Sequence, residues 1–170
     1  MPYFSIHIRT RAENEYITRT KSVLDDKETH LIWLRRSLRI TRRGKQIETL
    51  APIFPGYLFV ESKEISPELY MKLSRIPGFL RFLSSNDNIV PLSREDRDLL
   101  TYFLSFGQIV KKSVVYFDTS NRIRVVSGPL KQLEGQIIKV DRRKGRAKVR
   151  LDMFRDSFLI DFGFEAIEKT

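Results

Sequence analysis

The chain has 170 residues, of which 41% are hydrophobic, so it can bury a core in one domain or two small ones. It contains no cysteine, which excludes disulfides, thiol catalysis and cysteine-bound zinc and fits a reducing cytosol. Lys and Arg outnumber Asp and Glu by 31 to 21, and the net charge of +10 predicts a polyanionic partner, first of all a nucleic acid.

The first third of the chain alternates between strand and helix patterns. Tyr3–Ile8 predicts a strand, and a helix is expected from about Ala12 to Asp26, with its apolar residues at spacings of three and four. His30–Leu34 is a short apolar strand. Leu38–Thr49 predicts a hairpin that turns at Arg43-Gly44 and carries a basic tip.

The apolar stretch Ile53–Val60 is the feature around which the first half is organised. Pro55 and Gly56 predict a turn, and the residues from Tyr57 onward predict a buried strand. One interpretation is a turn that only feeds a core strand. The other is that Phe54 and Tyr57 lie at the strand start and present aromatic faces to a partner.

Two more helices are expected before the pattern changes. Ser66-Pro67-Glu68 predicts a capped helix start, and Pro77-Gly78 predicts its end. Phe79–Leu83 then predicts a strand, and a further helix follows Ser93 and ends near Gly107. We expect no signal peptide and no membrane span, because the N-terminus has no apolar h-region and the longest apolar run contains two prolines.

The last third of the chain loses the helical period and predicts a small barrel or sandwich of five short strands. The best boundary candidate is Asp118–Asn121. The clearest strand-like segments are Ile123–Val126, Gly135–Val140, Ala147–Leu151 and Phe158–Ile160.

Two basic clusters without acidic residues predict two separate contact surfaces for phosphate. The alternative is two solvated hairpins that only keep the protein soluble. The first cluster consists of Arg35, Arg36, Arg39, Arg42, Arg43 and Lys45. The second consists of Arg142, Arg143, Lys144, Arg146, Lys148 and Arg150.

The sequence offers little to catalysis. His7 and His30 have no Asp/Glu pair at motif spacing, and no serine lies in a nucleophile-elbow context. The basic run 42–45 lacks the second glycine and the Ser/Thr of a phosphate-binding loop. We therefore expect a protein that is not an enzyme and that uses neither a cofactor nor a metal ion.

Several segments in this order closely resemble NusG-type transcription elongation factors. Phe54–Val60, Ile76–Leu83 and Pro91–Ser93 resemble their N-terminal domain. Arg122–Leu130 and Leu133–Asp141 resemble their KOW domain. The resemblance covers nearly the whole chain and implies an α+β protein. Its parts would be an N-terminal NusG-type α/β domain over residues 1–110 (an antiparallel sheet with flanking helices), a linker over 111–120 and an all-β SH3-like KOW barrel over 121–170.

The resemblance also implies partners. In the family, the N-terminal domain grips the clamp helices of the largest subunit of RNA polymerase. Carried onto this chain, that surface would contain His7, Phe54, Pro55 and Tyr57. The residues expected to follow the displaced non-template DNA strand are Arg9, Arg11 and Arg19, joined by the hairpin tip Arg42, Arg43 and Lys45. Such a factor would be a monomer in the cytoplasm, bound to the nucleoid through polymerase and not to a membrane.

The C-terminal part resembles a specialised branch of the family. Housekeeping members carry a Gly-Arg-x-Thr-Pro segment where this chain has Met153–Leu159, and the turn Asp141–Arg146 is unusually basic. Both features are similar to the LoaP branch, which promotes antitermination of long operons and whose KOW domain binds an RNA hairpin. The RfaH branch can fold its KOW domain as helices, whereas the glycines and proline here favour a constitutive barrel.

The RNA-binding surface is therefore expected on the barrel. Because the basic segment has no aromatic residue on which bases could stack, a structured hairpin fits better than single-stranded RNA. The predicted residues are Lys131, Arg142, Arg143, Lys144, Arg146, Lys148 and Arg150. Two alternatives stay open: a housekeeping factor that links polymerase to Rho or the ribosome, and a ribosomal or general RNA-binding KOW protein.

Overall fold

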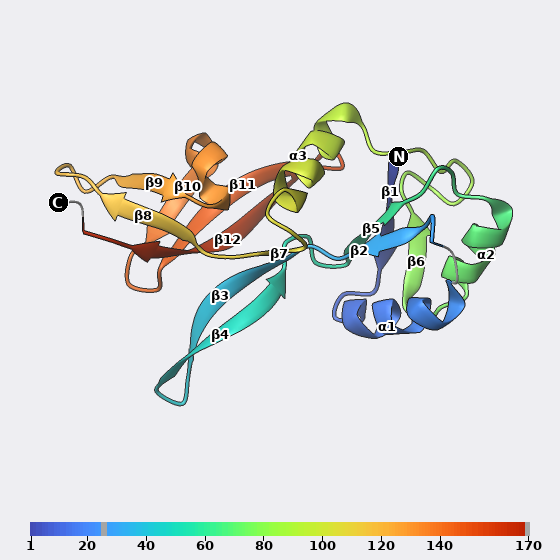
Figure 1. Cartoon of the computed structure of the whole chain (residues 1–170), viewed down its shortest axis with the longest axis horizontal. Helices are drawn as coiled ribbons and strands as arrows, with labels where there is room; N and C mark the ends of the chain where they lie inside the picture. The colour runs from blue at the N-terminus through green and yellow to red at the C-terminus, as the bar shows by residue number, and fades with distance from the viewer. Residues whose placement is uncertain (25–26, 169–170) are drawn as a thin grey trace. The chain divides into compact units, whose positions relative to one another are not determined.

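The computed structural model describes residues 1–24 and 27–168, which form two compact units (Figure 1). Unit 1 combines Met1–Trp33 with Phe54–Arg97, and unit 2 combines Leu34–Ile53 with Asp98–Thr170. The boundaries 1–110, 111–120 and 121–170 remain a prediction. In this structure, the compact units place the hairpin region 34–53 with the C-terminal part of the chain.

Unit 1 is an antiparallel sheet with two helices. The strand order is β2-β5-β1-β6. Its strands are β1 (Tyr3–Ile8), β2 (His30–Ile32), β5 (Tyr57–Glu61) and β6 (Phe79–Phe82), and its helices are α1 (Glu13–Val23) and α2 (Pro67–Ser74). Tyr16 of α1 and Leu73 of α2 pack in one cluster with Ile6 of β1, Leu58 of β5 and Phe82 of β6. The two helices therefore share a single apolar core with one face of the sheet.

Local signals set the helix ends in unit 1. The Ser66 hydroxyl accepts a hydrogen bond from the Leu69 backbone N–H at 3.1 Å, so Ser66 caps α2 as predicted. Gly78 follows α2 with a φ of 102°, a conformation that favours glycine. Helix α1 begins one residue after the predicted start at Ala12, and its predicted end at Asp26 lies outside the described residues.

Unit 2 contains a three-stranded sheet in the order β4-β3-β7 and a five-stranded sheet in the order β10-β11-β12-β8-β9. The first sheet consists of β3 (Arg35–Arg42), β4 (Lys45–Pro52) and β7 (Ile109–Val110). The second consists of β8 (Ser113–Phe117), β9 (Ile123–Ser127), β10 (Ile137–Asp141), β11 (Arg146–Met153) and β12 (Asp156–Ala166). The 3-10 turns η1 (Pro129–Gln132) and η2 (Glu134–Gln136) connect β9 to β10.

The five-stranded sheet curls into the predicted SH3-like, KOW-type barrel. Strand β12 is the middle strand of this order: it pairs with β11 in antiparallel register and with β8 in parallel register, which joins the two halves of the curled sheet. Alternate residues of β11 point inward: Ala147, Val149, Leu151 and Met153 are all buried. The predicted fold class is thus confirmed. Strand β8 was not predicted, and it occupies residues within the stretch 111–120 that was predicted as a linker.

Helix α3 (Arg94–Leu104) connects the two parts of the chain, and the boundary between the units falls inside it. Ser93 caps it by accepting a hydrogen bond from the Asp96 backbone N–H at 3.2 Å. Within unit 2, the ring of Phe103 stacks on Phe162 of β12 with centroids 5.7 Å apart. This contact fixes the C-terminal turns of α3 against the barrel.

Candidate functional sites

A stacked aromatic pair lies on the sheet of unit 1. His7 of β1 is the direct cross-strand partner of Tyr57 of β5, and their rings stack with centroids 4.7 Å apart and an interplanar angle of 12°. Both side chains are half-buried. Gly56 makes room for the pair. A Cβ there would lie 3.1 Å from the Ile8 carbonyl oxygen and 3.4 Å from His7 Nε2, and the φ of 83° also favours glycine.

The His7 imidazole is held in its neutral form at neutral pH. Burial lowers the pKa of His7 below its ordinary value, and the nearby positive charge of Arg81 lowers it further. Arg81 lies opposite His7 on β6. The stacked pair therefore presents an uncharged aromatic surface.

The other two residues of the predicted polymerase-binding set differ from each other in exposure. Pro55 is exposed in the turn before β5. Phe54 is only 1% exposed and packs edge-on against Phe59 with ring centroids 6.2 Å apart. Three of the four predicted side chains are thus reachable from solvent, and the Phe54 ring is part of the core instead.

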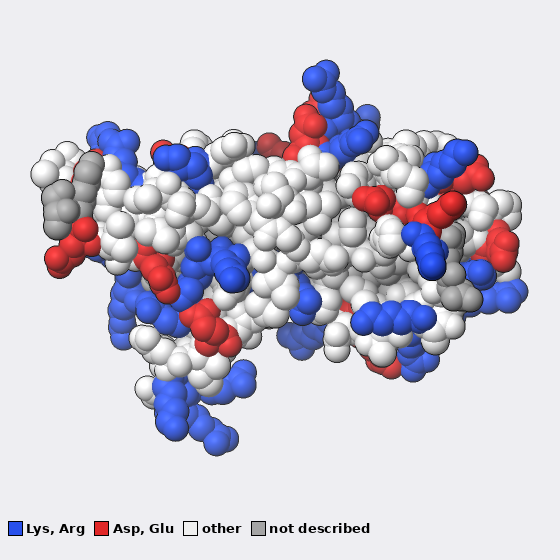
Figure 2. All heavy atoms as spheres, in the orientation of Figure 1, with Lys and Arg blue, Asp and Glu red and all other residues white. Residues whose placement is uncertain are grey.

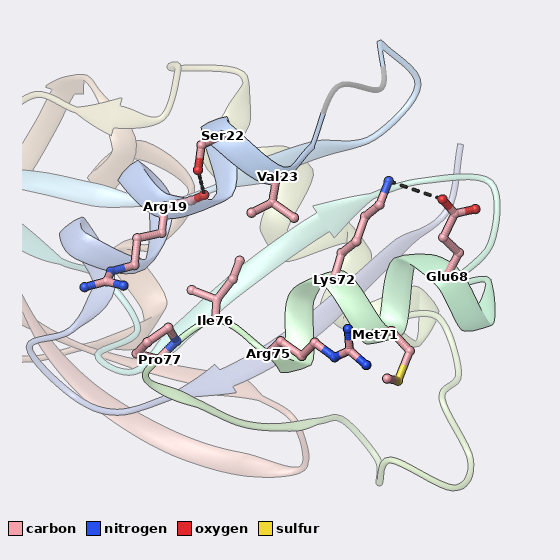
Figure 3. A pocket seen from close by; sticks show the side chains of 9 residues that line it. All are labelled: Arg19, Ser22, Val23, Glu68, Met71, Lys72, Arg75, Ile76 and Pro77. Atoms are coloured by element: carbon pink, nitrogen blue, oxygen red, sulfur yellow. Dashed lines mark hydrogen bonds and ion pairs between the residues drawn. The ribbon is translucent and has the colours of Figure 1, made fainter.

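Two of the predicted DNA-binding arginines of unit 1 precede α1, and the third, Arg19, lies within it. Arg9, Arg11 and Arg19 are all exposed. Arg19 forms an ion pair with Glu15 at 2.9 Å. Its side chain also lies at the rim of a groove of about 720 Å³ between α1 and α2, which has the apolar residues Val23 and Ile76 in its lining (Figure 3).

The predicted hairpin tip is confirmed as a tight turn. Strands β3 and β4 pair without interruption from Arg35↔Pro52 to Arg42↔Lys45. Arg43 and Gly44 have φ values of 53° and 75°, as in the two-residue hairpin turns whose twist matches the strands. The tip residues Arg42, Arg43 and Lys45 are exposed, and they belong to unit 2.

Several of the predicted RNA-binding residues already make contacts inside unit 2. The Arg142 guanidinium lies 4.1 Å from the centroid of the Phe117 ring and donates to Asn121 Oδ1 at 2.6 Å. Lys131 Nζ donates to the Val125 carbonyl oxygen at 3.0 Å, and Arg150 donates to Ser157 Oγ at 3.1 Å. These cations are oriented by neighbours before any ligand arrives.

The remaining residues of the predicted set are Arg143, Lys144, Arg146 and Lys148. Arg143 and Lys144 are exposed in the turn between β10 and β11. Lys148 and Arg150 share the outward face of β11, as the alternation predicted. Sequence reasoning missed Lys139, which lies directly opposite Lys148 across β10 and β11. Pairing the two strands around the basic turn would have found it.

The fold and these surfaces define a binding protein in which an antiparallel α/β unit carries an aromatic pair and a barrel unit carries a dense positive charge. Residues 1–101 match the family model described as "Transcription termination factor nusG". The chain therefore belongs to the NusG family of transcription termination and antitermination factors. Members of this family are transcription factors and not enzymes, which confirms the prediction that the chain is not an enzyme.

Individual relatives agree with this assignment. The NusG proteins of Pasteurella multocida and Thermus thermophilus are each 27% identical to this chain. The alignments cover 75% of the chain in both cases, with 69% of the Pasteurella protein and 72% of the Thermus protein. Both carry the name "Transcription termination/antitermination protein NusG".

A solved structure with a similar fold is that described as "Domain interaction in Thermotoga maritima NusG". It superposes with a TM-score of 0.56 at 17% identity and covers 95% of this chain and 93% of its own. Within residues 1–24 and 27–168, no helix is long and apolar enough to cross a membrane. The same residues contain no group of three or more His, Asp or Glu side chains placed to hold a metal ion.

Proposed function

We propose that this chain is a specialised elongation factor that binds RNA polymerase through unit 1 and promotes processive antitermination. Its partner surface on polymerase is the clamp helices of the largest subunit, and it acts in the cytoplasm, at the nucleoid. The observation that carries the proposal is the stacked pair of His7 and Tyr57. These rings are ordered, uncharged and partly exposed beside the turn of the family motif.

The chemistry of this pair suits a protein interface. Aromatic side chains dominate binding energy when they lie at the centre of an interface, and two stacked rings lose little conformational entropy on docking. Pro55 extends the surface, because it is exposed in the adjoining turn. Phe54 lies in the core, edge-on against Phe59.

The same unit would contact the non-template DNA strand. Arg9 and Arg11 are exposed just before α1. Arg19 extends this positive surface along α1 although Glu15 offsets part of its charge. Contacts of this kind give affinity for phosphate without reading sequence.

We further propose that the barrel binds a structured leader RNA hairpin and not Rho or the ribosome. The exposed side chains of Arg143 and Lys144 support phosphate binding. The β11–β12 turn supports a departure from the housekeeping members, because Phe154 and Arg155 both have a φ of 58° there without a glycine. The housekeeping role remains the second candidate, since the curated relatives carry the name of termination and antitermination proteins.

The decisive experiment is capture of purified RNA polymerase by the full chain. Tyr57→Ala should weaken capture by about tenfold or more, the usual loss when a central interface aromatic is truncated. Leu80→Ala is the matched control, because Leu80 is 50% exposed on β6 of the same unit. Wild-type capture by a folded Tyr57→Ala protein would refute docking through the aromatic pair.

A second comparison separates the two roles of the barrel. The full chain is tested for binding to Rho, to ribosomes and to the leader RNA of the operon that it regulates. We expect binding to the RNA alone, which is lost when Arg143 and Lys144 are both replaced by Gln. Binding to Rho or the ribosome with no RNA binding would establish the housekeeping role.

A further inference from the structure

The structure brings the two basic clusters of the sequence together inside unit 2. Arg146 of β11 donates from Nη2 to the Arg39 carbonyl oxygen of β3 at 3.0 Å. Arg36 of β3 donates to the Asp161 carbonyl oxygen of β12 and to the Pro52 carbonyl oxygen of β4. We call this contact between β3 and the strands β11 and β12 the seam. The hairpin and the barrel are thus held together by guanidinium groups on backbone oxygens.

Gly163 of the barrel allows β3 to approach so closely. A Cβ on Gly163 would lie 2.9 Å from the Ser37 carbonyl oxygen and 2.8 Å from Lys112 Cγ, nearer than real Cβ atoms come to their neighbours. Gly145 is a different case, because its φ of 67° favours glycine and a Cβ there would lie 3.0 Å from the Phe164 carbonyl oxygen of the barrel itself. The φ of Gly163 is not in the left-handed region, so space for β3 is what this position requires. The close approach of β3 at the seam therefore depends on a glycine at position 163 of the barrel.

The positive charges at the seam are only partly neutralised. Burial lowers the pKa of Arg36 to about 10, and the charge of Arg146 lowers it while that of Asp161 raises it. Arg146 Nε is buried without a hydrogen-bond partner among the described residues. The carboxylates of Glu48 and Glu165 are both bound by Lys112. Across the strands, Glu48 lies opposite Arg39 and Asp141 lies opposite Arg146, so the uncompensated positive charge lies mainly on the exposed cations of the two hairpin turns.

This positive surface continues on both sides of the seam. The hairpin tip begins three residues beyond Arg39, roughly 10 Å along an extended strand. On the barrel side, Arg143 and Lys144 are exposed, and Lys148 lies between Lys139 on β10 and Asp161 on β12. Figure 2 shows Lys and Arg side chains gathered on the hairpin and on the neighbouring part of the barrel. A positive surface of this length can contact several phosphates of a polyanion, and it is longer than a single phosphate group.

We propose that the β3–β4 hairpin and the β10–β11 hairpin of the barrel form one composite site for the phosphates of double-helical RNA, joined at Arg39 and Arg146. The proposal rests on RNA binding by the barrel, and it assigns to this RNA the hairpin tip Arg42, Arg43 and Lys45, which the family resemblance had placed on the non-template DNA strand. A helical RNA fits because neither β3–β4 nor β10–β11 contains an aromatic residue for base stacking. The nearby Phe117 ring already lies beneath Arg142.

The first test measures how RNA affinity of the full chain depends on salt. The probe is an RNA stem-loop of about 16 base pairs, the span that a double-strand-binding domain covers. One variant replaces Arg42, Arg43 and Lys45 by Gln, and a second replaces Arg143, Lys144 and Lys148 by Gln. The control replaces three exposed cations of unit 1, Lys27, Lys63 and Arg94, by Gln.

A composite site predicts the same behaviour for both triple variants of unit 2. Each lost phosphate contact reduces the slope of log affinity against log salt by about 0.7 to 1. We therefore expect each of these triple variants to reduce the slope by roughly 2 to 3, while the control keeps the wild-type slope. All three hairpin side chains are exposed, so their replacement leaves the fold intact.

The second test separates the hairpin from the barrel without changing any charge. Gly163→Ala places a methyl group against the Ser37 carbonyl oxygen, whereas Gly135→Ala meets nothing within 4 Å and is the matched control. We expect Gly163→Ala to reduce RNA affinity about as much as the hairpin triple variant. Combining the two should give little further loss, because both remove the same contacts. Thermal melting confirms that both alanine variants are folded.

The outcomes distinguish the composite site from the broader proposal that the barrel binds RNA. If the barrel variant loses RNA affinity and the hairpin variant keeps it, the composite site is refuted and RNA binding by the barrel stands. If neither variant changes affinity, both proposals fail. Equal affinity for a DNA duplex of the same sequence would also overturn the assignment to RNA.

Discussion

Unit 1 joins its elements through apolar packing, whereas unit 2 joins its hairpin to its barrel through charged groups. In unit 1, Tyr16, Leu73 and Phe82 meet in one cluster between the helices and the sheet. In unit 2, Arg36 and Arg146 bind backbone oxygens across the seam. Both arrangements bring together segments that are distant in the sequence. The side chains that remain accessible to partners are aromatic rings in unit 1 and cations in unit 2.

The difference explains what each unit can bind. The apolar core lies on one face of the sheet, and on the other face His7 and Tyr57 form a half-buried, uncharged aromatic surface beside the buried Phe59. A seam built from arginines on carbonyl oxygens satisfies the donors but does not cancel their charge. Positive charge therefore remains on unit 2 even after its internal contacts are made, and this charge is the basis of the proposed binding of phosphate.

The largest effect should come from the core of unit 1. Phe54→Ala should lower the free energy of unfolding by about 3 to 5 kcal/mol, because the ring is buried and its loss leaves a cavity. Denaturant unfolding followed by circular dichroism measures this loss. Leu80→Ala, on an exposed side chain, is the control. A loss of less than about 1 kcal/mol for Phe54→Ala would show that the ring is accessible and that unit 1 relies less on apolar packing.

The next largest effect should come from the seam of unit 2. Arg36→Ala removes a charged donor from the carbonyl oxygens of Asp161 and Pro52 and should lower the stability of unit 2 by about 3 kcal/mol. Arg36→Lys should restore only part of this, because a lysine lacks the planar fork that reaches two acceptors. Hydrogen exchange of β3 and β12 locates the effect, with exposed Arg42→Ala as the control. Unchanged protection in Arg36→Ala would contradict a seam held by cations.

A smaller loss is expected at the cap of α2. Ser66→Ala removes the acceptor for the Leu69 backbone N–H and should lower the stability of unit 1 by about 1 kcal/mol. Ser22→Ala on the exposed side of α1 is the matched control. Melting of both variants measures the difference. Equal melting temperatures would mean that packing alone fixes the start of α2.

The smallest effect concerns pH and the aromatic pair. The folded-state pKa of His7 lies below its unfolded value of about 6.5, so the unfolded chain binds the proton more readily between these two values. Stability from this group is therefore complete above about pH 6.5 and is lost as the pH falls towards the folded-state pKa. Melting temperatures between pH 5 and pH 8 should show this loss in wild type and in His30→Gln. The loss should be smaller in His7→Phe, and an unchanged loss there would assign it to other groups.

Signals within a few residues of each other determined much of unit 1. The alternation in Tyr3–Ile8 predicted β1, and the pair Ser66 and Pro67 predicted the start of α2, because strand pleating and helix capping are local properties. The turn at Arg43-Gly44 was predicted for the same reason. By contrast, β8 was missed, because its place in the barrel depends on parallel pairing with the distant strand β12.

The sequence by itself determined the family, the aromatic motif and the two basic clusters, because each of them consists of residues that are close together in the chain. Only the tertiary structure decided which members of these sets are accessible and which lie together. Phe54 is buried while Tyr57 stays half-exposed, because Phe54 packs against Phe59 and Tyr57 stacks on His7. Arg39 and Arg146 meet although they are 107 residues apart, because Gly163 leaves room for β3 against the barrel, and this space depends on the packing of distant strands and not on neighbouring residues.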